Sequence, residues 1–76
     1  MNDDDRKLIE QLAPAHQELT SLVTAHRSFE GQLDEMSARR YLSDAERLDM
    51  ARIKKQKLRG KDRILQILAE HRRANG

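Results

Sequence analysis

The stretch SARRYLSDAE, Ser37–Glu46, decides the fold because one helical pattern ends in it and another begins. Ser43 and Glu46 have the S-x-x-E spacing of a capping box, in which each side chain binds a backbone N–H at the start of a helix. The acidic residues that begin this helix also lie where the helix dipole favours negative charge. We therefore expect a turn over about residues 39–43, followed by a helix over about residues 44–72.

Upstream of the turn, apolar residues recur at alternating steps of three and four positions, which is typical of a helix that packs on another helix. The stripe consists of Leu19, Leu22, His26, Phe29, Leu33 and Met36. The same register meets Arg40 and fails there, which predicts that the helix ends near Ala38. Proline is tolerated in the first turn of a helix and is costly in its interior. Either a short helix ends near Leu12 or a longer helix is kinked at Ala13–Pro14, and we favour a break or kink with the main helix beginning at about Pro14.

About five linking residues force the two helices to lie antiparallel. Val23 is the only valine, and helix-favouring residues dominate, so little is present from which strands could form. We expect an all-α fold, an antiparallel two-helix hairpin that resembles a coiled coil, over residues 14–73. Residues 1–13 should form a frayed acidic N-terminus with a possible short helix before Pro14, and residues 74–76 a tail.

The second helix has a broader apolar stripe, which shares its face with lysines. At 100° per residue the stripe comprises Met50, Ile53, Leu58, Ile64, Leu65 and Leu68, with Lys57 and Lys61 near its centre. If Leu33 lies opposite Met50, His26 faces Lys57. The seam between the helices should therefore be polar in its middle and apolar at both ends.

The lysines on this face can lay their methylene stems over leucines and send their ammonium groups to the rim. Glu30 lies where Lys54 or Lys57 could reach it, and Glu18 lies where Lys61 could. Such exposed ion pairs contribute about 0–1 kcal/mol each. We expect them to fix the register of the two helices more than to stabilise the fold.

The most specific features are three stretches: HRSFEGQLDEM (26–36), SDAE (43–46) and IKKQKLRGKDRILQIL (53–68). Together they resemble the YdcH-like family of small bacterial helical proteins, a domain of unknown function. The family's histidine matches His26, and its lysine signature matches Lys54, Lys55, Lys57, Leu58, Lys61 and Asp62. Gly60 departs from the family pattern, in which a larger apolar residue is usual; a close helix approach would explain it, or it is a neutral position. The resemblance covers about Glu18 to Ala69 and implies an antiparallel helical hairpin with no established activity.

The sequence lacks the motifs of an enzyme or a metal site. It has no Cys nucleophile, no G-x-S-x-G and no glycine-rich phosphate loop, and two helices form no deep pocket. The three histidines are not at metal-binding spacing. His26 could be a ligand or a pH switch, but a polar seam residue that sets helix register is the favoured interpretation. We expect no catalysis, no cofactor, no metal and no small-molecule substrate.

Basic residues concentrate in the second helix. Residues 52–63 include seven basic residues and one acid, a local charge of +6, and the rest of the chain carries −4, which gives the net charge of +2. The outward members Arg52, Lys55, Arg59 and Arg63 could contact phosphate groups. Because no aromatic residue in this run could stack on bases, weak and sequence-neutral nucleic-acid binding is the alternative function.

Association with another protein, or with a second copy, is the function that the sequence favours. One hairpin offers little core, and without cysteine no disulfide can stabilise it. Val23, Leu42, Leu48 and Ile67 lie off the predicted seam and leave apolar surface for a partner, most simply in a homodimer that forms a four-helix bundle. The lack of cysteine, of a signal-like N-terminus and of a membrane-length apolar run favours the cytoplasm and excludes a membrane span.

Overall fold

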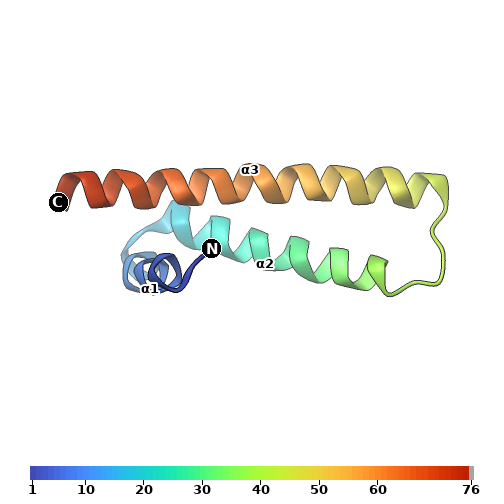
Figure 1. The fold of residues 1–76 in the computed structure, drawn as a ribbon, viewed down its shortest axis with the longest axis horizontal. Helices are drawn as coiled ribbons and strands as arrows, with labels where there is room; N and C mark the ends of the chain where they lie inside the picture. The colour runs from blue at the N-terminus through green and yellow to red at the C-terminus, as the bar shows by residue number, and fades with distance from the viewer. Residues whose placement is uncertain (76) are drawn as a thin grey trace.

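A computed structural model describes residues 1–75, which form three α-helices, one 3₁₀ turn and no strand. In chain order the elements are α1 (Asp3–Leu12), η1 (Ala13–Ala15), α2 (Gln17–Ser37) and α3 (Asp44–Asn75), as Figure 1 shows. The prediction of an all-α chain is confirmed. Within the described residues, no helix combines the length and the apolar character that crossing a bilayer requires.

The length of α3 sets the shape of the molecule. Its 32 residues should span about 48 Å at about 1.5 Å per residue, and the longest dimension of the chain is 48 Å. The 21 residues of α2 span only about 32 Å and run back along α3 in the opposite direction (Figure 1). The last turns of α3 therefore extend beyond α2, and α1 packs there.

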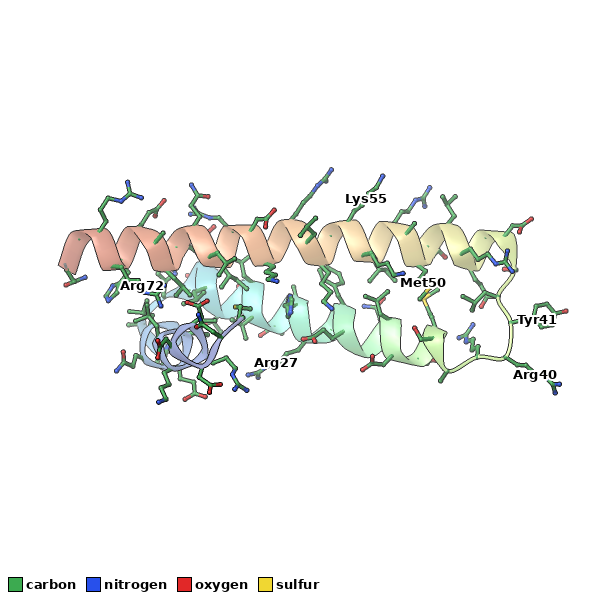
Figure 2. All side chains as sticks on the ribbon, viewed as in Figure 1. Arg27, Arg40, Tyr41, Met50, Lys55 and Arg72 are labelled. Atoms are coloured by element: carbon green, nitrogen blue, oxygen red, sulfur yellow. The ribbon has the colours of Figure 1, made fainter. Side chains whose placement is uncertain are left out.

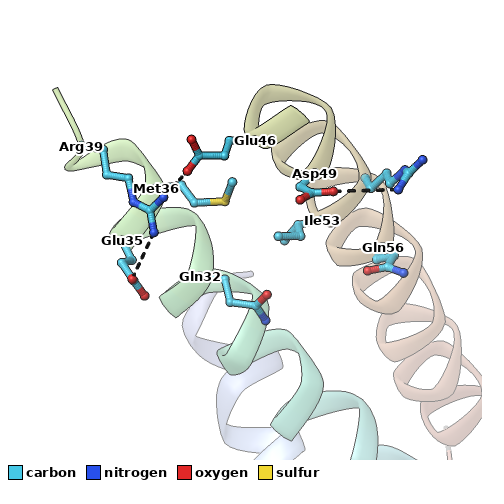
Figure 3. A pocket seen from close by; sticks show the side chains of 9 residues that line it. Gln32, Glu35, Met36, Arg39, Glu46, Asp49, Ile53 and Gln56 are labelled. Atoms are coloured by element: carbon cyan, nitrogen blue, oxygen red, sulfur yellow. Dashed lines mark hydrogen bonds and ion pairs between the residues drawn. The ribbon is translucent and has the colours of Figure 1, made fainter. Parts of the chain in front are cut away.

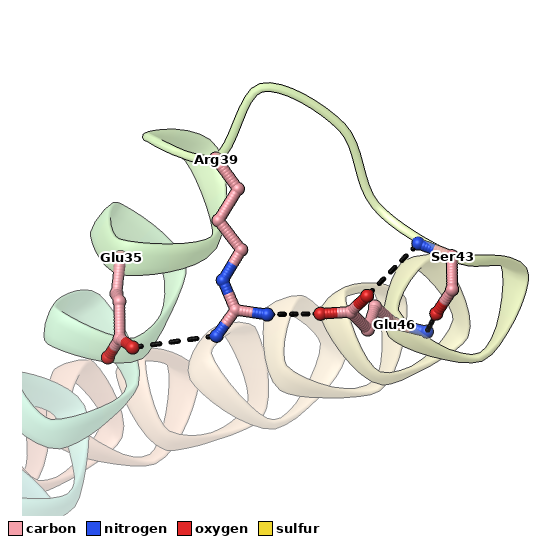
Figure 4. Close-up of polar contacts among 4 residues, drawn as sticks. All are labelled: Glu35, Arg39, Ser43 and Glu46. Atoms are coloured by element: carbon pink, nitrogen blue, oxygen red, sulfur yellow. Dashed lines mark hydrogen bonds and ion pairs between the residues drawn. The ribbon is translucent and has the colours of Figure 1, made fainter.

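The turn between α2 and α3 contains the predicted capping box, which is confirmed. The Glu46 N–H donates to Ser43 Oγ and the Ser43 N–H donates to Glu46 Oε1, both at 3.1 Å. The Arg39 guanidinium binds Glu46 and lies 3.5 Å from the Glu35 carboxylate, as Figure 4 shows. Arg39 thus connects the last turn of α2 to the first turn of α3 across the loop.

The N-terminal segment differs from the frayed start that the sequence predicted, because it forms the possible short helix as α1. Asn2 caps this helix by accepting a hydrogen bond from the Asp5 N–H at 2.8 Å, and three aspartates occupy the first turn, where the helix dipole favours them. Asp5 is largely buried and accepts a hydrogen bond from Arg72 of α3 at 2.9 Å. These contacts hold α1 against α3.

The main helix begins at Gln17 and not at Pro14. Pro14 lies in the 3₁₀ turn η1, and His16 then adopts an extended conformation with φ −131° and ψ 96°. The His16 ring caps α2 by accepting from the Leu19 N–H at 3.1 Å. The proline is therefore accommodated in a separate short turn, which lets the chain change direction between α1 and α2.

The C-terminal helix is longer than predicted. Of the expected tail 74–76, Ala74 and Asn75 belong to α3, and Gly76 lies outside the described residues. The Asn75 side chain donates to the His71 carbonyl at 2.9 Å and so satisfies one of the last backbone acceptors.

The core lies where all three helices meet. Leu19 of α2 and Ile64, Ile67 and Leu68 of α3 are buried there. The residues packed against them are Leu8, Ile9, Leu12, Ala13, Leu22, Val23 and Leu65. The prediction that Ile67 remains available to a partner is wrong, because Ile67 is buried in this core, whereas Val23 packs against the core and stays half-buried. Leu48 remains 55% exposed and Leu42 is half-buried.

Candidate functional site

The predicted seam residues lie at different depths along the two helices. Buried members are Leu19, Leu33, Ile64 and Leu68. Half-buried members are Leu22, His26, Phe29, Met36, Met50, Ile53, Lys57, Lys61 and Leu65. Most of the buried members lie in the half that α1 covers, so the half nearer the turn has a more open seam.

Leu58 does not belong to the seam, since it is 59% exposed. The line of contact along α3 passes through Ile53, Lys57 and Ile64, at steps of four and seven residues. One residue beyond Lys57 is a rotation of about 100°, which carries Leu58 past the edge of α2. The apolar stripe predicted for this helix was therefore too broad on that side.

The ion pairs between α2 and α3 also differ from the prediction. Glu18 binds Arg63 and not Lys61, with two hydrogen bonds of 2.8 and 2.9 Å to the guanidinium. These hydrogen bonds are the main reason that the pKa of Glu18 is lowered and the pKa of Arg63 is raised from their ordinary values. Two parallel bonds match a planar guanidinium better than an ammonium group, which explains why arginine is the partner. Glu30 contacts His26 and no lysine among the described residues.

His26 occupies a half-buried seam position. Its Nε2 lies 3.3 Å from the Glu30 carboxylate, and its Nδ1 is buried without a hydrogen-bond partner in residues 1–75. No cluster of three His, Asp, Glu or Cys side chains that could hold a metal ion occurs in the same residues. The position of His26 agrees with its interpretation as a polar residue of the seam.

The four predicted polyanion contacts do not share one free face. Arg63 points toward α2 and binds Glu18, which corrects the prediction that it is outward. Arg52 lies 3.8 Å from Asp49 and, like Arg59, lines the side of α3 that borders α2. Of the four, Lys55 projects from the side of α3 away from α2 (Figure 2).

A groove runs between α2 and α3 and consists of two hollows that share Gln56. We call it the open groove and define it by Leu22, Ala25, Phe29, Gln32 and Met36 of α2 and Ile53, Gln56, Arg59 and Gly60 of α3. Figure 3 shows the hollow nearer the turn, with Met36 and Ile53 facing each other and Gln32 and Gln56 at its edges. The Arg39–Glu46 pair lies at one end, and the Glu18–Arg63 pair joins the helices beyond the other.

The groove is open because few side chains fill it. In this half of the molecule Leu33 is the residue with a buried apolar side chain. A Cβ atom at Gly60 would meet no atom within 4 Å, so the glycine is not explained by a close approach of the two helices. Because Gly60 has no side chain, the surface of α3 has a notch there, in the same hollow as Leu22 and Phe29.

Several residues of the groove were not identified from the sequence. Ala25, Gln32 and Gln56 flank the apolar stripes and have no chemical feature that marks them as a site. The available signal was the combination of Gly60 with these small or uncharged residues on the same side of the two helices. That side becomes evident only when the rotation of each helix about its axis is known.

Comparison with known proteins gives one match. The family model described as "Protein of unknown function (DUF465)" matches residues 19–68, about two thirds of the chain. No curated protein and no solved structure matches significantly. The matched segment begins at buried Leu19, ends at buried Leu68 and contains the whole open groove. The chain therefore belongs to the DUF465 family, also called YdcH-like, as the three sequence stretches predicted.

Proposed function

We propose that the chain is a non-catalytic protein that acts by protein–protein association, and that the open groove is the surface that binds. One observation carries this proposal: the half of the molecule near the turn leaves Phe29, Met36 and Ile53 only half-buried between two helices, while α1 covers the other half. The functional unit in this proposal is the antiparallel, coiled-coil-like hairpin of α2 and α3.

The composition of the groove supports association. Its apolar lining includes an aromatic residue and a methionine, and charged side chains border it, which in the hollow near the turn are Glu35, Arg39, Glu46, Asp49 and Arg52. Interfaces commonly have this arrangement of a desolvated centre and a polar rim, and aromatic residues, methionine and arginine are enriched in them. Covering the half-buried side chains would remove apolar area from water at about 25 cal/mol per Å².

Gly60 and Gly31 provide a matched test of this proposal. Both are mid-helix glycines at which an added Cβ would meet open space, but Gly60 lines the groove and Gly31 is exposed away from it. Gly60→Gln should fill the notch and reduce capture of partners from the source cell, whereas Gly31→Gln should not. Both variants should remain fully helical because glutamine favours helix more than glycine does. Equal capture by the two variants would contradict the proposal.

A second candidate function is weak, sequence-neutral nucleic-acid binding. The observation in its favour is that Lys54, Lys55, Lys57 and Lys61 have no carboxylate within 4.0 Å among residues 1–75. Replacing exposed Lys55 and Arg59 with glutamate should preserve helicity, and should weaken any retention on DNA or RNA equally for all sequences and flatten its salt dependence. Absence of salt-dependent retention of the unmodified chain would exclude this function.

A further inference from the structure

We infer that the open groove is occupied by a second copy of this chain, related by a two-fold axis parallel to the helices, so that α2 of each copy lies on α3 of the other. The inference rests on the proposed function and adds to it the identity of the partner and the arrangement of the complex. Three features of the groove support it: complementary shape, the distribution of charge and the available area.

The shape of the groove is self-complementary. A two-fold interface uses the same patch on both subunits, so each patch must offer both a projection and a recess that fits it. Phe29 of α2 is half-buried in the groove, and Gly60 of α3 provides an empty notch in the same hollow. If α2 of the second copy lies on α3, its Phe29 reaches the notch at Gly60, and the reciprocal contact forms at the same time.

The charge distribution selects this arrangement over the other two-fold arrangement. At 100° per residue, Arg52, Arg59 and Arg63 fall within about 40° of one another on the groove side of α3. Placing α3 on α3 would bring two such rows together, and like charges opposite one another are unfavourable. The groove side of α2 carries uncharged Ala25 and Gln32 along most of its length, and its charged residues, Glu35 and Arg39, lie near the turn. Arg63 is bound to Glu18 and Arg52 lies 3.8 Å from Asp49, so Arg59 is the arginine of this row whose side chain can lie over α2 of the other copy.

The area of the groove is sufficient for a reversible dimer. The α2 segment that lines the groove, from Leu22 to Met36, is about 21 Å long at about 1.5 Å per residue. Two packed helices present a face roughly 20 Å wide, given an interaxial distance of about 9 Å. Each copy would then bury about 420 Å², and both about 840 Å², which is in the range of weak, transient interfaces below about 1,200 Å². We therefore expect monomer and dimer to coexist over an accessible concentration range.

Sedimentation equilibrium on the full chain over a hundredfold concentration range tests the occupant. We expect a monomer–dimer equilibrium, weakened about tenfold or more by Gly60→Gln and unchanged by Gly31→Gln. An 8.9 kDa species at every concentration would overturn the inference, and so would a dimer that Gly60→Gln does not weaken. If the chain is monomeric but captures another protein, and Gly60→Gln reduces that capture, the proposed function stands. If the chain neither dimerises nor captures another protein in a way that depends on Gly60, the proposed function is contradicted as well.

Disulfide trapping tests the arrangement, and the chain contains no cysteine that would interfere. Gln32 of α2 and Arg52 of α3 both line the hollow near the turn. In the proposed dimer, Gln32 of one copy faces Arg52 of the other. Mixing a Gln32→Cys chain with an Arg52→Cys chain under mild oxidation should give the mixed disulfide as the main product. A dimer that forms no mixed disulfide would show that α2 does not lie on α3 of its partner and would overturn the arrangement.

Discussion

The open notch at Gly60 makes a quantitative prediction about stability. A glycine in the interior of a helix costs about 1 kcal/mol relative to alanine, because its backbone loses more conformational freedom on folding. In this chain a Cβ at Gly60 would meet no atom within 4 Å, and Gly60 has no positive φ. Gly60→Ala should therefore stabilise the monomer by nearly the full value, about 0.8–1.0 kcal/mol.

The assay is thermal unfolding followed by far-ultraviolet circular dichroism, at a concentration where the chain is monomeric. For a chain of this size a change of about 1 kcal/mol corresponds to a rise in Tm of about 4–8 °C. Gly31→Ala is the matched control, because Gly31 is also mid-helix with an open environment. Both substitutions should raise Tm by similar amounts.

One outcome would refute this reasoning. If Gly31→Ala stabilises the monomer and Gly60→Ala does not, the side chains around Gly60 must close over it, and the notch would not exist. If instead both alanines stabilise the monomer, repeating the measurement at high concentration tests the dimer. A methyl group in the notch should then disturb the contact with Phe29 of the second copy, so the gain at Gly60 should shrink while the gain at Gly31 remains.

Three further substitutions test the fold and its electrostatics. Leu68→Ala should cost about 2–5 kcal/mol of unfolding free energy because Leu68 is fully buried, whereas Leu58→Ala should cost less than about 0.5 kcal/mol because Leu58 is exposed. Chemical denaturation of the two variants measures both costs, and equal costs would place Leu58 in the core. Glu18→Gln should lower stability at neutral pH and have no effect in strong acid. The hydrogen bonds from Arg63 lower the pKa of Glu18 below its ordinary value of 4.5, so the contribution of Glu18 to stability is lost as the pH falls through the lowered value. Parallel pH–stability curves for the two chains would contradict this. Ser43→Ala should cost about 1 kcal/mol through loss of the cap to the Glu46 N–H, visible as a lower Tm, and an unchanged Tm would show that the capping box does not stabilise α3.

Much of the helical organisation could be predicted because it depends on local chemistry. The capping box at Ser43 and the failure of the apolar stripe at Arg40 are signals confined to a few residues, and the structure has α2 end at Ser37 and α3 begin at Asp44. The cap on α1 is equally local, since Asn2 followed by three aspartates is a helix start. Local signals do not show that α1 is stable, because the short apolar patch behind its cap needs a surface to pack on.

The docking of α1 and the open groove could not be predicted in the same way. The first requires knowing that α3 is longer than α2, which leaves Ile67 uncovered until Leu8 and Ile9 pack near it. The second depends on the rotation of each helix about its own axis. A rotation of one residue separates half-buried Lys57 from exposed Leu58, and a broad apolar stripe does not define the rotation that closely.

The most direct test of the central claim, that a second copy fills the open groove, is the change in backbone amide chemical shifts on dilution of the unmodified chain, followed by solution NMR. The account predicts that the shifts which depend on concentration cluster around Phe29, Ile53 and Gly60, and that Gly31 and the exposed face of α1 do not change. Spectra that are identical at all concentrations, or changes that cluster on α1 or around Leu58, would contradict it.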